Sequence, residues 1–338
     1  MARVVDIGVD LGTASVVIYG RGKGVLLNEA ACIAYDRDTR NVLAVGDEAA
    51  QWIGRAPGNI VVERPFGEGV VADADLLIAM LRYLVSIVNS KGLFSRFRML
   101  ISVPYGFNHS ERSKLINSLF ETGAHKVQMI ERPIAAAIGA GLPMDDAYGK
   151  MICDIGGGMT EIAVLSQGRM VVREAVKIAG DAFDDAIIKF IRKKHNIVIG
   201  PATAESLKKT IGFALPQSEQ FFMEVPGRNL LSGLPIIKRI YSDEITEALD
   251  EPVHQLLEAI HSVLEHTPAE LISDIFEQGI VFSGGGAMLG RLCEAASTAL
   301  KVKCFLAEDA QECVARGCGL TLENMNEFGK YLSKRREW

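Results

Sequence analysis

Near the middle of the chain, an aspartate is followed by three consecutive glycines. Asp154 lies in an apolar run over residues 150–155, glycines occupy positions 156–158, and a second apolar run begins at Thr160. This pattern predicts a strand, a tight turn and a second strand. Glycine N–H groups can surround a phosphate chain where any Cβ would obstruct it, and an acid beside them suits hydrated Mg²⁺. For this stretch alone, a glycine-rich hairpin without a ligand is the alternative.

The same arrangement occurs near the N-terminus, and a third glycine turn lies near the C-terminus. Asp10 ends an apolar run, Gly12 and Thr13 follow it, and another apolar run continues the chain. Residues 283–289 place three glycines after a strand-like segment and before a helix, so their backbone could lie against a nucleoside. Asp10 and Asp154 belong to different halves of the chain, which indicates two variations on one α/β unit. Three such loops in this order predict a nucleotide site.

The composition fits a cytosolic protein of two domains. A chain of 338 residues exceeds one average core, and 49% hydrophobic residues are enough for buried sheets. The net charge of −6 argues against a nucleic-acid partner. The six cysteines show no metal-ligand spacing, so buried free thiols are expected. We expect no signal peptide, because a strand starts at once, and no membrane span, because no uncharged apolar run reaches ~18 residues.

Strand-like and helix-like periodicities alternate along the chain, which predicts an α/β fold. Asp73 is expected to cap a helix, and Pro133 to open an alanine-rich one. Thr267 begins a pattern with capping-box spacing, which predicts another helix start. The last helix is expected to run from about residue 317 into the basic tail 330–338.

Further motifs accompany the three loops. They are Arg64-Pro65 with 69–73, Val103-Pro104-Tyr105-Gly106, the segment 133–142, Gly180-Asp181, Ser232-Gly233-Leu234-Pro235 and Thr267-Pro268 with Glu270-Leu271. With Asp10-Leu11-Gly12-Thr13-Ala14, 154–161 and 283–287, they resemble the actin, Hsp70 and sugar-kinase superfamily and, within it, the MreB family of bacterial actins. The resemblance extends to about residue 322 and so covers nearly the whole chain.

This resemblance implies an actin-like two-domain fold, with ATP and Mg²⁺ in the central cleft and a smaller subdomain inserted in each domain. The expected boundaries are residues 1–32, 66–145 and 315–338 for domain IA, 33–65 for subdomain IB, 146–181 and 243–314 for domain IIA, and 182–242 for subdomain IIB. Asp10 and Asp154 would hold Mg²⁺ through water. The implied nucleotide contacts are Thr13, Ala14, Ser15, Gly156, Gly157, Gly158, Glu205, Lys208, Gly285, Gly286, Ala287 and Met288. For Glu205 and Lys208, an ordinary solvated helix face is the alternative.

The chain departs from the family at the two positions that serve hydrolysis. The family has a glutamate before the proline of the alanine-rich helix and a threonine after the triple glycine, and here these are Arg132 and Met159. A guanidinium cannot act as a base, and methionine has no hydroxyl to orient water. Thr160 and Glu131 are candidate substitutes, although a continuing strand would point Glu131 elsewhere. We expect weakened ATP hydrolysis, with a paralogue that still hydrolyses slowly as the alternative.

A short segment combines apolar and basic side chains in a way that suits a membrane surface. Leu93, Phe94 and Phe97 stand among lysine and arginine residues. Exposed apolar side chains ringed by bases bind anionic bilayers, and the family's membrane-insertion loop falls at this place. The tail 330–338 could add contact, and a frayed helix end is the alternative.

The resemblance therefore implies an ATP-binding cytoskeletal protein that forms membrane-associated filaments, directs cell-wall synthesis and determines rod shape. Its partners would be further copies of itself, the inner face of the cell membrane and membrane proteins of the cell-elongation machinery. One alternative is a regulatory paralogue that caps or co-polymerises with an active MreB protein. Another is a small-molecule kinase on the same fold, but it would need a carboxylate base where Arg132 stands.

Overall fold

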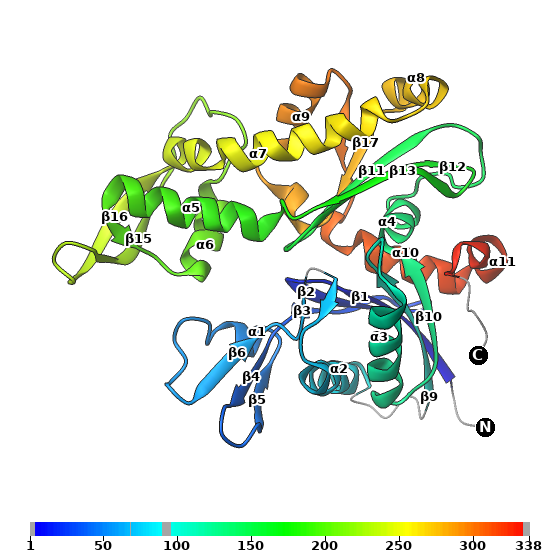
Figure 1. Ribbon diagram of the computed structural model, residues 1–338, viewed down its shortest axis with the longest axis horizontal. Helices are drawn as coiled ribbons and strands as arrows, with labels where there is room; N and C mark the ends of the chain where they lie inside the picture. Colours follow the sequence, from blue (N-terminus) through cyan, green and yellow to red (C-terminus); the bar gives the residue numbers. More distant parts are fainter. Residues whose placement is uncertain (1–3, 68, 90–95, 334–338) are drawn as a thin grey trace.

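The computed structural model describes residues 4–67, 69–89 and 96–333, which form two halves built on one five-stranded sheet each (Figure 1). The first sheet consists of β1 (Val4–Leu11), β2 (Ser15–Gly20), β3 (Gly24–Ala30), β9 (Arg96–Val103) and β10 (Ala124–Glu131). The second consists of β11 (Lys150–Ile155), β12 (Thr160–Ser166), β13 (Arg169–Val176), β17 (Ile280–Ser283) and β18 (Cys304–Leu306).

The two sheets share one strand order. It is β3-β2-β1-β9-β10 in the first and β13-β12-β11-β17-β18 in the second. In both sheets the first three strands are antiparallel neighbours, and the last two continue the sheet in parallel. The repeat predicted from the two aspartate–glycine segments is therefore present in the backbone, with β1 and β11 at equivalent positions.

Helices cover both sheets and lie between them. α2 (Ala74–Val88) and α3 (His109–Glu121) share the core of the first sheet, and α5 (Gly180–His195) and α7 (Ser242–Glu265) share that of the second. α4 (Arg132–Gly139) and α10 (Cys313–Glu323) lie between the two halves (Figure 1). The other helices are α1 (Asp47–Ala50), α6 (Pro201–Ile211), α8 (Ala269–Gln278), α9 (Leu292–Leu300) and α11 (Met325–Phe328), with short 3₁₀ turns η1 (Gly285–Met288), η2 (Ala310–Glu312) and η3 (Gly329–Tyr331).

Each half carries a small antiparallel sheet, and both small sheets lie on the same side of the molecule (Figure 1). The one in the first half consists of β4 (Ile33–Asp36), β5 (Val42–Val45) and β6 (Ile60–Glu63), and that in the second half of β14 (Ile197–Val198), β15 (Phe222–Asn229) and β16 (Pro235–Tyr241). β7 (Phe66–Gly67) and β8 (Val70–Val71) form a two-stranded ribbon. The small sheets fall within the segments expected as subdomains, and the residue boundaries of the four units stay a prediction.

α4 and α10 cross at close range because each carries a glycine at the contact. A Cβ on Gly139 would collide with the carbonyl oxygen of Cys313, and one on Gly317 with that of Ala135. Arg316 Nε also donates to the carbonyl oxygen of Gly139 at 2.8 Å. The contact between these two helices therefore depends on glycines, because the lack of a Cβ lets the two backbones approach.

The helix starts expected at Asp73, Pro133 and Thr267 are confirmed, whereas the capping box at Thr267 and the extent of the last helix are wrong. Asp73 caps α2, because its carboxylate accepts from the backbone N–H of Leu76 at 3.0 Å. The hydroxyl of Thr267 instead donates to the carbonyl oxygen of Val263 at 2.7 Å, so the expected capping box at the start of α8 does not form. α10 starts at Cys313 and ends at Glu323, short of the tail, of which residues 334–338 lie outside the described part of the chain.

Candidate functional site

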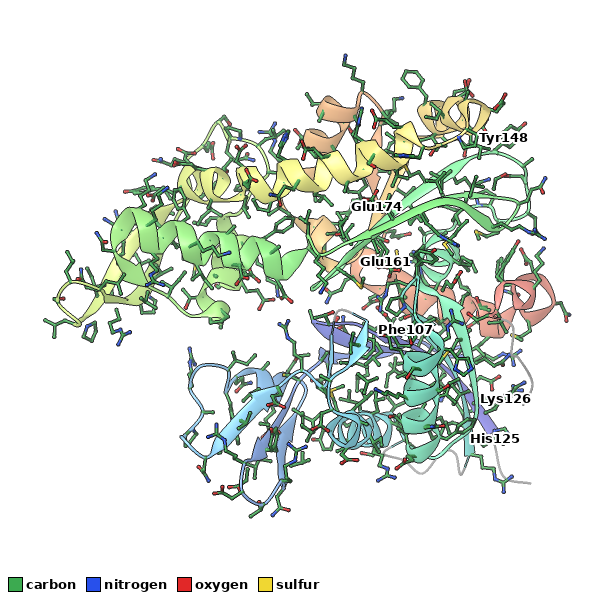
Figure 2. The ribbon with its side chains drawn as sticks, in the orientation of Figure 1. Phe107, His125, Lys126, Tyr148, Glu161 and Glu174 are labelled. Carbon is green, nitrogen blue, oxygen red and sulfur yellow. The ribbon has the colours of Figure 1, made fainter. Side chains whose placement is uncertain are left out.

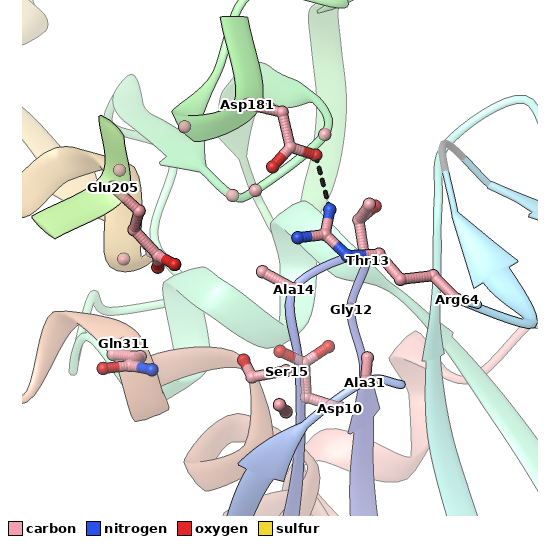
Figure 3. A pocket seen from close by; sticks show the side chains of 18 of the residues that line it. Asp10, Gly12, Thr13, Ala14, Ser15, Ala31, Arg64, Asp181, Glu205 and Gln311 are labelled. Atoms are coloured by element: carbon pink, nitrogen blue, oxygen red, sulfur yellow. Dashed lines mark hydrogen bonds and ion pairs between the residues drawn. The ribbon is translucent and has the colours of Figure 1, made fainter. Parts of the chain in front are cut away.

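A cavity of about 780 Å³ lies between the two halves. Its wall is formed by the three glycine segments, the N-terminus of α5, one face of α6 and the region around α1. Figure 3 shows Asp10, Ala14 and Ser15 on the first hairpin, with Glu205 and Gln311 across the space from them. The three loops that predicted a nucleotide site are thus brought to one place.

The first two loops are hairpins with the same backbone closure. The N–H of Gly12 donates to the carbonyl oxygen of Ser15 at 2.9 Å, and that of Gly156 to Met159 at 3.0 Å. Each hairpin follows an aspartate whose carboxylate accepts a hydrogen bond from a serine hydroxyl on the parallel neighbouring strand. The two hydrogen bonds have the same length. Ser102 donates to Asp10 Oδ1 at 2.8 Å and Ser283 to Asp154 Oδ1 at 2.8 Å.

The central glycines are required by the contact between these two hairpins. A Cβ on Gly157 would lie 2.6 Å from Cβ of Ala14, and one on Gly158 would lie 2.8 Å from Oγ1 of Thr13. Real Cβ atoms do not approach other heavy atoms so closely, so side chains here would push the two halves apart. The sequence predicted glycine for access to phosphate, and the structure adds a second reason, which is the contact between hairpins.

The third glycine segment, which includes η1, packs against the second hairpin. Gly284 has φ +85°, and its Cβ would collide with the carbonyl oxygen of Ile155. Gly285, Gly286 and Met288 line the cavity, and Met288 is 58% exposed. Ala287 is buried in the core of the second half and is not among the residues that line the cavity, so its expected nucleotide contact stays a prediction.

Glu205 and Lys208 of α6 line the cavity, as the resemblance implied, but both already have charged partners. Lys208 Nζ lies 2.8 Å from Asp184 Oδ2 and donates to the carbonyl oxygen of Gly180 at 3.0 Å. Glu205 pairs with Lys209 at 2.7 Å. Burial raises the pKa of Asp184 to about 6, although Lys208 acts in the opposite direction. The structure therefore places α6 at the cavity through a half-buried ion pair with α5.

Arg132 lies inside a cluster of three carboxylates. Its Nη2 is 2.9 Å from Asp10 Oδ1 and donates to the carbonyl oxygen of Leu11 at 2.9 Å. Its Nη1 is 3.8 Å from Asp154 Oδ2, and its Nε is 3.4 Å from Glu161 Oε2. Only 11% of the Arg132 side chain is exposed, and Glu161 lies near the centre of the molecule between the halves (Figure 2). The sequence predicted the loss of a base here, and the structure shows what the guanidinium binds.

Burial opposes the charges of Arg132, Asp154 and Glu161, and attraction between the guanidinium and the carboxylates offsets it. Against the effect of burial, Asp10, Asp154 and Glu161 raise the pKa of the Arg132 guanidinium above its ordinary value. Burial raises the pKa of Glu161 to about 7, and Arg132 opposes that rise. Glu161 Oε2 is buried without a hydrogen-bond partner among the described residues, although Arg132 Nε lies 3.4 Å away as an ion-pair partner.

The expected role of Asp10 and Asp154 as joint holders of hydrated Mg²⁺ does not fit this arrangement. Asp10 Oδ1 already accepts from Ser102 and faces Arg132. A divalent ion between the two aspartates would lie beside a fixed guanidinium, and like charges repel. The aspartates are balanced by a cation of the protein itself.

The two candidate substitutes for the hydrolytic groups already have other partners. Met159 lines the cavity, but Thr160 is fully buried, and its hydroxyl donates to the carbonyl oxygen of Ile178 at 2.6 Å. Glu131 lies outside the cavity wall, and its carboxylate is 3.9 Å from Arg112 Nη2. Each side chain is directed to another partner in this structure, and a role of either in hydrolysis stays a prediction.

An ion pair across the cavity was missed by sequence reasoning. Arg64 Nη1, beside the β4–β6 sheet, lies 2.8 Å from Asp181 Oδ2 at the N-terminus of α5 (Figure 3). Both side chains line the cavity. Their positions in the chain differ by 117 residues, and no local spacing relates them. Both stood in the motifs that carried the resemblance, which was the only available signal.

The expected membrane segment is only partly within the described residues. Leu93 and Phe94 lie outside them, in the range 90–95. Phe97 is the second residue of β9 and is 6% exposed in the core of the first half, so it is not available for a membrane contact. Among the described residues, the helices are all too short or too polar to cross a bilayer.

Comparisons with known proteins agree with the architecture. Residues 4–330 match the family described as MreB/Mbl protein. The chain is 42% identical over 325 residues to the cell shape-determining protein Mbl of Bacillus subtilis (strain 168), covering 96% of this chain and 98% of Mbl. It is 43% identical over 329 residues to the cell shape-determining protein MreB of Escherichia coli (strain K12), covering 96% of this chain and 95% of MreB.

Solved structures give the same result. The crystal structure of MreB5 of Spiroplasma citri bound to ADP superposes with a TM-score of 0.91 at 34% identity, covering 96% of this chain and 98% of that one. The same protein bound to AMPPNP gives a TM-score of 0.90 at 33% identity, covering 98% of this chain and 99% of that one. The repeated sheets and the cavity between them define an actin-like protein. Within that class, the chain belongs to the MreB/Mbl family.

Proposed function

We propose that this protein binds ATP in the cavity and assembles with further copies of itself into filaments on the inner face of the cell membrane. There the filaments direct cell-wall synthesis and hold rod shape, together with membrane proteins of the elongation machinery. The observation that carries the proposal is the pair of equivalent aspartate–glycine hairpins facing one cavity. The nucleotides bound to MreB5 and the names of the Mbl and MreB relatives support it.

Nucleotide binding is tested by thermal unfolding with and without ATP. A ligand that binds only the folded state stabilises it by about 2.7 kcal/mol at a hundredfold excess over Kd. Gly158→Val is the matched variant, because its side chain would enter the contact with Thr13. We expect a nucleotide-dependent rise in Tm for the parent and a smaller one for the variant. The absence of any rise in the parent would contradict the proposal.

We further propose that ATP hydrolysis is weak. Arg132 engages Asp10 and Glu161, and Met159 offers no hydroxyl where it lines the cavity. Losing one positioned group of this kind lowers the rate by about 10²–10⁴. The same observation favours a second candidate function, in which the protein caps or co-polymerises with an MreB protein that hydrolyses ATP.

Sedimentation with parallel phosphate release separates the two candidates. The protein is pelleted with ATP alone, with an actively hydrolysing MreB relative, and without nucleotide. Pelleting alone with slow phosphate release supports an autonomous filament. Pelleting only with the relative, or shortening of the relative's filaments, supports the regulatory role. Failure to pellet under every condition would contradict both.

Membrane association is proposed to depend on Leu93 and Phe94, which follow α2 and precede β9. Two buried side chains of this type would contribute about 3–6 kcal/mol. Replacing both by serine should release the protein from anionic liposomes in co-sedimentation. Tyr148→Ser is the matched control, because Tyr148 is 60% exposed and lies in the other half (Figure 2). Unchanged sedimentation of the double variant would contradict this part of the proposal.

A further inference from the structure

We infer that Arg132 is a built-in counter-cation of the phosphate site, so that a nucleoside triphosphate binds about equally well with and without a divalent metal. The inference rests on the proposed function, because it concerns the same cavity. The guanidinium of Arg132 would balance the negative charge of Asp10 and Asp154, as a metal ion between them would otherwise do.

The position of the guanidinium is fixed before any nucleotide arrives. Arg132 is the first residue of α4 and precedes Pro133, so its backbone is held at a helix N-terminus. Its Nη2 is anchored by Asp10 and by the carbonyl oxygen of Leu11, each at 2.9 Å. The residue is buried yet belongs to the cavity wall, so the cation faces the site from a preformed position.

A hydrated Mg²⁺ would find one carboxylate oxygen of each aspartate already engaged. Mg²⁺ requires near-octahedral geometry, keeps several waters and binds proteins through carboxylate oxygens. Asp10 Oδ1 already faces Arg132 and accepts from Ser102, and Asp154 Oδ1 accepts from Ser283 at 2.8 Å. A divalent ion there would also be repelled by the guanidinium at short range. Binding of Mg²⁺ between the two aspartates is therefore expected to be weak.

The same guanidinium reduces the electrostatic repulsion between the carboxylates and a bound polyphosphate. Without Arg132, the formal charge of Asp10, Asp154 and Glu161 would be −3, and with it the charge is −2. The other cations of the cavity wall, Arg64, Lys208 and Lys209, are paired with acids outside this cluster. Removing Arg132 therefore leaves three uncompensated carboxylates at the phosphate hairpins, and a nucleotide would then bind well only with a metal.

The test is the Kd of a nonhydrolysable ATP analogue, measured by isothermal titration calorimetry in excess Mg²⁺ and in excess EDTA. We expect the two values for the parent protein to agree within about threefold, a small difference when tenfold equals 1.4 kcal/mol. A larger loss in EDTA overturns the inference and leaves nucleotide binding intact. No binding in either buffer overturns the proposed function and the inference with it.

Variants assign the effect to Arg132. Arg132→Gln should weaken binding in EDTA about tenfold or more relative to Mg²⁺, and Arg132→Lys, which keeps the charge, should stay near the parent ratio. If the glutamine variant does not fold, the ratio of the two Kd values of the lysine variant still tests the inference. Lys209→Gln is the matched control, because Lys209 lines the cavity but pairs with Glu205, so both Kd values should shift together. Equal ratios in all variants, or a metal-dependent lysine variant, would overturn the role of Arg132.

Discussion

The buried guanidinium can be tested by removing its charge while keeping a polar side chain. In Arg132→Gln, Asp10, Asp154 and Glu161 lose a common cation whose nitrogens lie 2.9, 3.8 and 3.4 Å away. Breaking a buried ion pair by removing one partner costs about 3–5 kcal/mol, because an uncompensated charge stays in a medium of low polarity. We therefore expect the free energy of unfolding to fall by about 3–5 kcal/mol without nucleotide.

Urea unfolding followed by circular dichroism measures this change. Arg55→Gln is the matched control, because Arg55 is exposed, and its effect should stay within about 0.5 kcal/mol. Adding Glu161→Gln to Arg132→Gln should recover about 0.5–3 kcal/mol, the usual range for coupled contacts. A glutamine there still accepts from the backbone N–H of Tyr105, which is 2.6 Å from Glu161 Oε1, but carries no charge. An Arg132→Gln variant as stable as the control, with no coupling to Glu161→Gln, would refute the reasoning.

Three other substitutions probe the contact between α4 and α10, a half-buried acid and the core. Gly317→Ala would place a Cβ against the carbonyl oxygen of Ala135 and should lower the free energy of unfolding by about 1–3 kcal/mol in urea. Burial raises the pKa of Asp184 to about 6 despite Lys208, so the folded state holds that proton more tightly than the unfolded chain. The free energy of unfolding should therefore decrease as pH rises from about 4 to 6, and Asp184→Asn should flatten that slope. Phe97→Ser should cost about 3–5 kcal/mol of stability, with liposome binding of the remaining folded protein unchanged.

The features that sequence predicted best are those encoded within a few residues. The hairpins at Asp10 and Asp154 are marked by an apolar run, an acid and glycines in direct succession, and the structure contains both. Asp73 likewise caps α2 through a contact three residues away. Such signals depend on local geometry alone, so one sequence is enough to find them.

The failures arise where a distant partner decides between two local outcomes. Thr267 has capping-box spacing, but the preceding helix α7 ends so close to it that its hydroxyl binds the Val263 carbonyl oxygen instead. Phe97 stands among basic residues, yet it is the second residue of β9, which lies between β1 and β10, and its side chain joins the core. Arg132 was identified as a missing base, but its binding to Asp10 depends on the tertiary fold.

Restoring the hydrolytic pair tests whether Arg132 and Met159 are what weakens turnover. Arg132→Glu with Met159→Thr would replace the cation by a fourth acid beside Asp10 and supply a hydroxyl at the cavity wall. We expect phosphate release to rise by about 10²–10⁴, and only with Mg²⁺, because the carboxylates would then lack any cation of the protein. Met159→Thr alone is the control and should gain little, since the guanidinium still engages the aspartates. The double variant should also show a Mg²⁺-dependent rise in Tm that the parent lacks. Family-like turnover in the parent, with no gain in the double variant, would mean that another group of the cavity wall positions the water.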